Sequence, residues 1–178
     1  RTLHAGGFNV TMPCKTAVAQ LVDKLSPAAE LVGACNTVVF EEDGTMTGHM
    51  TDGVGFVRNL KEHGVDIKGE KIVLLGTGGA ATAIAVQAAL DGVDEIAIFN
   101  RKDEFYANGE KTVEKIKKAV PSIQKVYIED LDNTELLGRV IDRKRYSDQC
   151  NPRGNEPDAG CDPLFRQSSF VRSWRLQM

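Results

Sequence analysis

The spacing of apolar residues changes character partway along the chain. In the first part the apolar runs are short, and strand-like and helix-like spacings both occur. Residues 7–10 and 36–40 predict strands, and residues 45–49 return antiparallel after a Glu-Asp-Gly turn. After Pro13 a helix is expected, with its apolar face formed by Val18, Leu21, Val22 and Leu25, and a further helix with one apolar face is expected from Gly53. This part of the sequence therefore predicts a mixed α/β unit.

Further along, apolar strands alternate with helices. Residues 71–75, 95–99 and 124–128 are almost continuously apolar and predict strands, while residues 79–90 and 108–119 predict helices between them. Continuous apolar strands separated by helices indicate a parallel sheet that is covered on both faces. The expected fold class is α/β.

Residues 139–178 differ in composition from the rest. Seven arginines lie there, against three in the preceding 138 residues, and the hydrophobic periodicity stops at the same place. We therefore expect three parts: residues 1–65, residues 66–138, and an atypical arginine-rich tail over residues 139–178. The sheet should end after its third strand, and the tail should be irregular and mostly exposed because it lacks an apolar face.

The overall composition is that of an ordinary soluble globular protein, with 42% hydrophobic and 26% charged residues. A net charge of −3 gives no reason to expect nucleic acid or an anionic membrane as a partner. The four cysteines form no CxxC pair and have no nearby histidine at zinc-ligand spacing, so we expect free thiols, no metal and a cytoplasmic location. The chain starts at Arg1, close to the first expected strand, and we expect residues to precede it.

A glycine-rich turn links the strand at residues 71–75 to the alanine-rich helix that follows it. The pattern Gly-x-Gly-x-x-Ala matches the dinucleotide fingerprint, in which glycines allow a tight turn and close approach of the pyrophosphate. The N–H groups at the start of the helix would then face the phosphates. A turn that only packs is the alternative. The candidate cofactor-binding residues are Gly76, Thr77, Gly78, Gly79, Ala80 and Ala81.

The loop after the second strand of the parallel sheet, where cofactor choice is made, reads Asn100-Arg101-Lys102-Asp103. Arg101 and Lys102 could pair with a 2′-phosphate, while Asp103 could accept from a ribose hydroxyl. The cofactor is therefore NADP or NAD, and a solvated charged loop is the alternative.

Three residues before the parallel sheet have side chains suited to chemistry on a hydroxylated substrate. Lys15 follows a proline-stiffened turn and has the position of a general acid or base, or of an anchor for a hydroxyl or carboxylate; an inert exposed lysine is the alternative. Asp52 lies at a strand-to-helix junction, where it could pair with Lys15 or only cap the helix. Asn36 offers an amide suited to a polyol, against the alternative of a simple strand start.

Four motifs occur together in the order and approximate spacing of one enzyme family. They are Asn-Val-Thr-x-Pro-x-Lys ending at Lys15, Gly-Ala-x-Asn-Thr around Asn36, Thr-Asp-Gly at Asp52, and Gly-x-Gly-Gly-Ala from Gly76. The chain resembles the shikimate dehydrogenase family over residues 5–137. The resemblance implies a truncated Rossmann-like parallel sheet, preceded by part of an α/β substrate-binding domain.

The resemblance also implies roles for single residues. Lys15 and Asp52 would be the catalytic pair, and Thr11 and Asn36 would bind substrate hydroxyls. The implied reaction is reversible hydride transfer between the nicotinamide and the C3 hydroxyl carbon of shikimate, which gives 3-dehydroshikimate. The run from Asn100 to Phe105 is more similar to the quinate/shikimate dehydrogenase branch, so quinate is the alternative substrate. A homodimer is compatible with the complete protein.

The chain departs from the family pattern at several points. Met50 stands where the family usually has Asn before Thr-Asp-Gly, and the family's N-terminal Ser-x-Ser segment and C-terminal helices are absent. We therefore expect a central fragment that is inactive alone. Dropping one nucleotide around residues 148–157 can restore a family-like turn, which makes a frame error one explanation of the tail; a basic tail for an acidic partner is the other.

Two functions from other classes remain open. A non-catalytic regulatory domain would bind the dinucleotide but would need neither Lys15 nor Asp52. A nucleic-acid adaptor would use the arginine-rich tail and would bind with strong salt dependence. Among enzymes, a methylene-tetrahydrofolate dehydrogenase-like protein shares the two-domain plan, but the run that ends at Lys15 favours the shikimate group.

Overall fold

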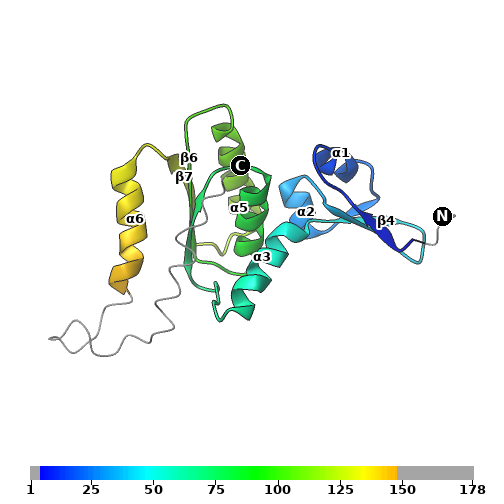
Figure 1. The fold of residues 1–178 in the computed structure, drawn as a ribbon, viewed down its shortest axis with the longest axis horizontal. Coiled ribbons are helices and arrows are strands. Elements are labelled where there is room, and N and C mark those ends of the chain that lie inside the picture. The colour runs from blue at the N-terminus through cyan, green and yellow to red at the C-terminus, as the bar shows by residue number, and fades with distance from the viewer. Residues whose placement is uncertain (1–4, 148–178) are drawn as a thin grey trace.

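A computed structural model describes residues 5–147 of the chain, with side chains up to Ile141. It contains two sheets, a four-stranded one with the order β1-β3-β4-β2 and a three-stranded one with the order β5-β6-β7. Figure 1 shows the four-stranded sheet and α1 at one end of the molecule, the three-stranded sheet and α6 at the other, and helices α2, α3 and α5 between them.

The four-stranded sheet is built around the predicted hairpin. Strands β3 (Thr37–Phe40) and β4 (Met46–His49) pair antiparallel, and β1 (Gly7–Asn9) adds to the other edge of β3, also antiparallel. Buried Val38 and Cys35 lie at the centre of its apolar cluster. The hairpin prediction is confirmed.

The helix predicted after Pro13 is much shorter than its apolar spacing suggested. Helix α1 covers only Lys15–Ala19, and the chain then forms β2 (Lys24–Leu25), which pairs parallel with β4. Leu21, assigned to the apolar face of that helix, is 72% exposed. The prediction of a longer helix is wrong here because strand pairing overrides the weak local signal.

The three-stranded sheet is parallel, as predicted. Strands β5 (Lys71–Leu75), β6 (Glu95–Asn100) and β7 (Lys125–Asp130) pair in register, with helices α4 (Gly79–Leu90) and α5 (Tyr106–Ala119) as the crossovers. Side chains of β6 alternate between two clusters: Ile96 and Ile98 pack with α4 and α5, while Ala97 and Phe99 face the other side. Both faces of this sheet are therefore covered.

Helix α6 (Thr134–Ser147) corrects two predictions about the end of the chain. It packs on the second face of the sheet, where Val140 is 5% exposed and joins Ala97 and Phe99. The periodicity therefore does not stop at residue 138, and the expectation of an irregular, exposed chain is wrong over the start of the tail. The apolar residues 136, 137 and 140 already carried the helical period. The rest of the predicted tail, and the frame-error hypothesis built on it, lie outside the described residues.

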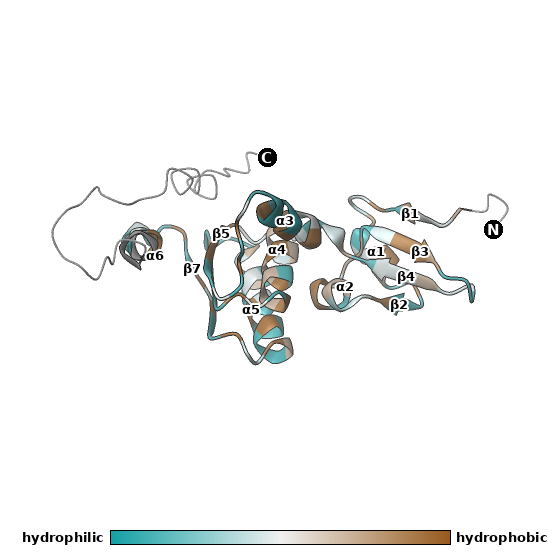
Figure 2. Cartoon of the chain, turned by 90° about the horizontal axis from the view of Figure 1, so that it is seen from below, coloured by the Kyte–Doolittle hydropathy of each residue, from teal (hydrophilic) through white to brown (hydrophobic). Residues whose placement is uncertain are grey.

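Helices α2 and α3 pack against α4 between the two sheets. Helix α2 (Pro27–Val32) starts with Ser26 as N-cap, and its Ala28 packs in the same apolar cluster as Val86 of α4. Helix α3 (Thr51–Glu62) runs from the end of β4 and packs along α4. Figure 2 shows α3 and α4 side by side between the two sheets.

Candidate functional site

Lys15 and Asp52 meet although 37 residues separate them. Lys15 is the first residue of α1, and Asp52 lies in the first turn of α3. The Lys15 Nζ donates to Asp52 Oδ2 at 2.8 Å, and the two side chains are 28% and 39% exposed. The positive end of the helix dipole at the start of α3 favours a carboxylate there. The two residues thus form a solvent-accessible ion pair near the start of β3 and the end of β4, the central strands of the sheet.

Asn36 joins this pair from the position just before β3. Its Nδ2 donates to Asp52 Oδ1 at 2.7 Å, and its Oδ1 accepts from the backbone N–H and the hydroxyl of Thr51 at 3.0 and 3.1 Å. The structure therefore brings three of the four predicted substrate-site residues, Lys15, Asp52 and Asn36, into one hydrogen-bonded cluster.

Thr11, the fourth, lies in the exposed turn between β1 and α1. Its carbonyl accepts from the Cys14 N–H at 2.9 Å, which shapes the turn that precedes Lys15. The Lys15 carbonyl in turn accepts from the Cys35 N–H at 3.0 Å and ties the start of α1 to the chain before β3. Cys35 is buried, which raises the pKa of its thiol and keeps it protonated.

The backbone of the glycine-rich turn is open at the start of α4. Gly76 has a φ of +104°, which residues with a Cβ rarely adopt, and Gly78 is the N-cap of α4. A Cβ built on Gly76, Gly78 or Gly79 would meet no protein atom within 4 Å. Space is therefore open where a pyrophosphate would approach the first N–H groups of α4, and the turn fits such a group.

Thr77 belongs to the same turn but faces inward. It is 6% exposed, and its hydroxyl donates to the Phe105 carbonyl at 2.9 Å. Gly109 of α5 lies against it, because a Cβ there would come within 2.6 Å of the Thr77 Cγ2. Thr77 therefore ties the turn to the loop before α5. Gly109 was not singled out from the sequence, since a lone glycine in a helix does not reveal what packs on it.

The last residue of β6, Asn100, and the loop after it hold the four residues predicted to choose the cofactor. The carboxylate of Asp103 accepts from the Asn100 amide at 3.1 Å and from the Phe105 N–H at 2.9 Å through the same Oδ1. Arg101 is exposed and has no ion-pair partner among residues 5–141, while Lys102 lies 3.8 Å from Asp130. Asp103 therefore shapes the loop, and the side chain of Arg101 remains available to bind an anion.

Gly53 belongs to the Thr-Asp-Gly motif, but the sequence did not reveal its packing role. A Cβ on this residue would lie 2.3 Å from the Ala83 carbonyl oxygen and 2.7 Å from the Gln87 Cβ. Helices α3 and α4 can approach this closely only because residue 53 is glycine. Asp52 is thereby held next to the helix that starts at the glycine-rich turn.

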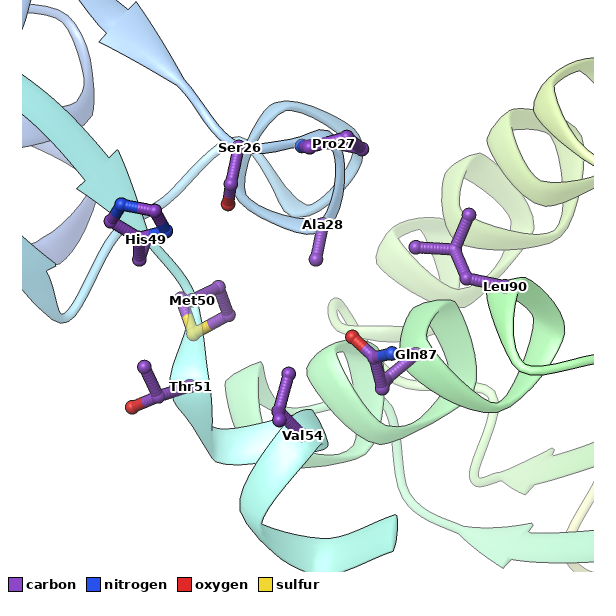
Figure 3. Close-up of a pocket in the computed structure, with 9 residues that line it drawn as sticks. All are labelled: Ser26, Pro27, Ala28, His49, Met50, Thr51, Val54, Gln87 and Leu90. Carbon is purple, nitrogen blue, oxygen red and sulfur yellow. The ribbon is translucent and has the colours of Figure 1, made fainter. Parts of the chain in front are cut away.

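A cavity of about 420 Å³ opens on another side of the same junction. Figure 3 shows it between the start of α2, the end of β4 and the C-terminal half of α4, with His49, Met50, Gln87 and Leu90 around it. Neither Lys15 nor Asp52 lines it. Thr51 lines the cavity and also bonds to Asn36, so the cavity adjoins the cluster of Lys15, Asn36 and Asp52 (the Lys15 cluster) without including its three side chains.

Two further observations concern the described residues only. None of their helices is long and apolar enough to span a membrane. No group of three or more His, Cys, Asp or Glu side chains among residues 5–141 is placed to hold a metal ion.

Comparison with known proteins gives matches at the level of family, sequence and structure. Residues 1–38 match the family model of the shikimate dehydrogenase substrate binding domain. The chain is 57% identical over 172 residues, 97% of its length, to a shikimate dehydrogenase (NADP(+)) of Listeria monocytogenes, and it spans 58% of that relative.

Solved structures give the same picture. A shikimate 5-dehydrogenase from Listeria monocytogenes, in complex with shikimate and NAD, matches with a TM-score of 0.75 and 56% identity, over 79% of this chain and 47% of that one. A quinate dehydrogenase from Corynebacterium glutamicum, in complex with NAD, matches with a TM-score of 0.65 and 32% identity, over 76% and 47% of the two chains. The chain thus spans about half the length of these relatives.

Proposed function

The chain belongs to the shikimate dehydrogenase family over the residues that these relatives match, and we propose that the full-length protein is an NAD(P)-dependent shikimate or quinate dehydrogenase. The observation that carries this proposal is the Lys15–Asp52 ion pair, whose neighbour Gly53 packs against α4, the helix that starts at the glycine-rich turn. Residues 1–65 would belong to the substrate-binding domain and residues 66–138 to the nucleotide-binding domain. A cytoplasmic location and a dimeric full-length protein belong to the same proposal.

The reaction requires that a proton leave a hydroxyl as a hydride leaves the same carbon. The chemistry supplied by the bound cofactor is hydride transfer at C4 of its nicotinamide. Lys15 would exchange the proton with the substrate oxygen, and Asp52, which accepts from its Nζ, would hold the ammonium in place. Thr11 and Asn36 would direct substrate hydroxyls toward this pair.

The nucleotide would be held by the glycine-rich turn and the loop after β6. The open backbone of Gly76, Gly78 and Gly79 would hold the pyrophosphate against the start of α4. Exposed Arg101 would pair with a 2′-phosphate, which supports NADP, while no feature of the loop rejects NAD. One Listeria relative is a shikimate dehydrogenase (NADP(+)), and the solved Listeria structure is a complex with NAD.

A non-catalytic dinucleotide-binding regulatory domain is the second candidate. It would use the turn before α4 but would give no reason for Lys15, Asp52 and Asn36 to converge from three elements. The test is to assay the full-length protein with shikimate and quinate, each with NADP and NAD. Reduction of either cofactor with either substrate supports the dehydrogenase. Dinucleotide binding without turnover on both substrates would favour the regulatory domain.

A further inference from the structure

The backbone of Asn36 is fixed where three strands of the four-stranded sheet end. Its N–H donates to the His49 carbonyl at 2.9 Å, and its carbonyl accepts from the Val10 N–H at 2.7 Å. The residue is therefore held on both sides by main-chain bonds, and its side chain starts from a defined position.

The side-chain amide is oriented by two unlike partners. The Thr51 N–H can only donate, so the atom 3.0 Å from it must be the Asn36 oxygen. The Asp52 carboxylate can only accept, so the atom 2.7 Å from its Oδ1 must be the Asn36 nitrogen. A flipped amide would set oxygen against oxygen and donor against donor.

Asn36 also acts where the regular helix cap is missing. Met50 is the N-cap residue of α3 and makes no side-chain cap bond, because a thioether is a poor acceptor. The Asn36 Oδ1 accepts the first N–H of α3 from the neighbouring strand instead. The start of the helix, and with it Asp52, is thereby anchored to the sheet.

We propose that Asn36 is a positioning residue, which orients the Asp52 carboxylate so that Oδ2 faces Lys15. The inference rests on the proposed function and deepens it. With Oδ1 of Asp52 occupied by the Asn36 amide, the carboxylate has one orientation, and Lys15 is held through the other oxygen at 2.8 Å. One N–H of Asn36 remains for a substrate hydroxyl. Loss of the amide should therefore lower kcat more than it raises KM.

The variant Asn36→Asp separates the two halves of the amide. It keeps an oxygen for the Thr51 N–H and so preserves the start of α3, but it replaces the donor to Asp52 by a second carboxylate. Two facing carboxylates repel each other and share a proton, and their added charge also favours the protonated form of Lys15. In the full-length protein, kcat should fall about tenfold or more, and KM should rise by a smaller factor because the N–H left for a substrate hydroxyl is also lost. The pH of half-maximal kcat should rise by about one unit.

Two further variants complete the test. Asn36→Ala should also lower kcat, but without a shift of the pH profile because it adds no charge, and it should lower the thermal midpoint because α3 loses its cap. Asn59→Asp is the matched control, since it makes the same chemical change at an exposed position of α3, two helical turns after Asp52. It should leave kcat, KM and the pH profile as in the wild type. If Asn36→Ala does not fold, Asn36→Asp decides the question alone.

Three outcomes would overturn the inference. A raised KM with wild-type kcat and an unmoved pH profile in Asn36→Asp would leave Asn36 a substrate contact only. An equal change in Asn59→Asp would show a general charge effect. A wild-type protein that turns over neither shikimate nor quinate would remove the proposed function, and the inference with it, whereas the first two outcomes leave the function standing.

Discussion

The Lys15 cluster and the glycine-rich turn differ in how the chain builds them. The cluster joins side chains from α1, the start of β3 and α3, so its geometry exists only when the four-stranded sheet is formed. The turn is one contiguous segment between β5 and α4, and it presents backbone rather than side chains. A side-chain site of this kind should be sensitive to single substitutions in ways that a backbone site is not.

The largest expected effect separates chemistry from nucleotide binding. In the full-length protein, Lys15→Ala should lower turnover by about 10² or more, because acid–base help typically contributes that much, while dinucleotide affinity stays nearly constant. Steady-state kinetics and fluorescence titration measure the two. Lys24→Ala is the control, since the Lys24 side chain is 61% exposed and its Nζ lies 3.9 Å from Asp43 Oδ2, a long ion pair. Near-normal turnover in Lys15→Ala would remove this lysine from the mechanism.

The next effect tests the contact that joins the two regions. Gly53→Ala should destabilise the protein by about 1–3 kcal/mol, because the new methyl group overlaps the Ala83 carbonyl and forces α3 away from α4. Gly55→Ala, in the same helix with nothing within 4 Å, should instead stabilise by about 0.5–1 kcal/mol. Denaturant unfolding of both variants measures the difference. Equal stabilities would mean that the two helices do not pack as closely as described.

A smaller effect should appear only in the affinity for the dinucleotide. Arg101→Ala should weaken NADP by about tenfold and NAD much less, because only NADP offers a 2′-phosphate for a charge-assisted bond. Titration of the variant and the wild type with each cofactor measures the two losses of affinity. Equal losses for the two would make Arg101 a general neighbour of the dinucleotide and leave cofactor choice to other residues of the loop.

The smallest effect concerns an ion-pair group at the N-terminal ends of β5, β6 and β7, the end of the parallel sheet opposite the glycine-rich turn. Burial opposes ionisation of Glu95, but Lys71 at 2.8 Å and Lys125 at 3.9 Å outweigh it and hold the pKa of Glu95 below its ordinary value of 4.5. The carboxylate therefore contributes stability above pH 4.5, and this contribution is lost as the pH falls through the lowered pKa. Glu95→Gln should lose up to about 1 kcal/mol at pH 7 and flatten this acid dependence, measured by urea unfolding between pH 3 and 7. An unchanged acid slope would exclude Glu95 as its source.

Much of the parallel sheet could be predicted from the sequence. The bounds of β5 and α4 agree with the prediction, and those of β6, α5 and β7 differ by one or two residues, because continuous apolar strands and a helix of alanines leave few alternatives. The prediction failed where the local signal was weak. The short α1 and β2 follow the pairing with β4, and α6 extends into a region whose composition had argued against order.

For the site, the sequence determined which residue types were present and on which elements they stood. The glycines of the turn could be recognised at once, since their role depends on their own backbone conformation and on the strand and helix beside them. The sequence left open whether Asp52 pairs with Lys15 or only caps α3, and the tertiary structure decided for the pair. It alone decided that Asn36 orients that carboxylate and that Gly53 brings α3 against α4. The two hydrogen bonds join residues 37 and 16 apart in the chain, and the third contact places a glycine without a Cβ against another helix. Such contacts are set by packing rather than by any local pattern.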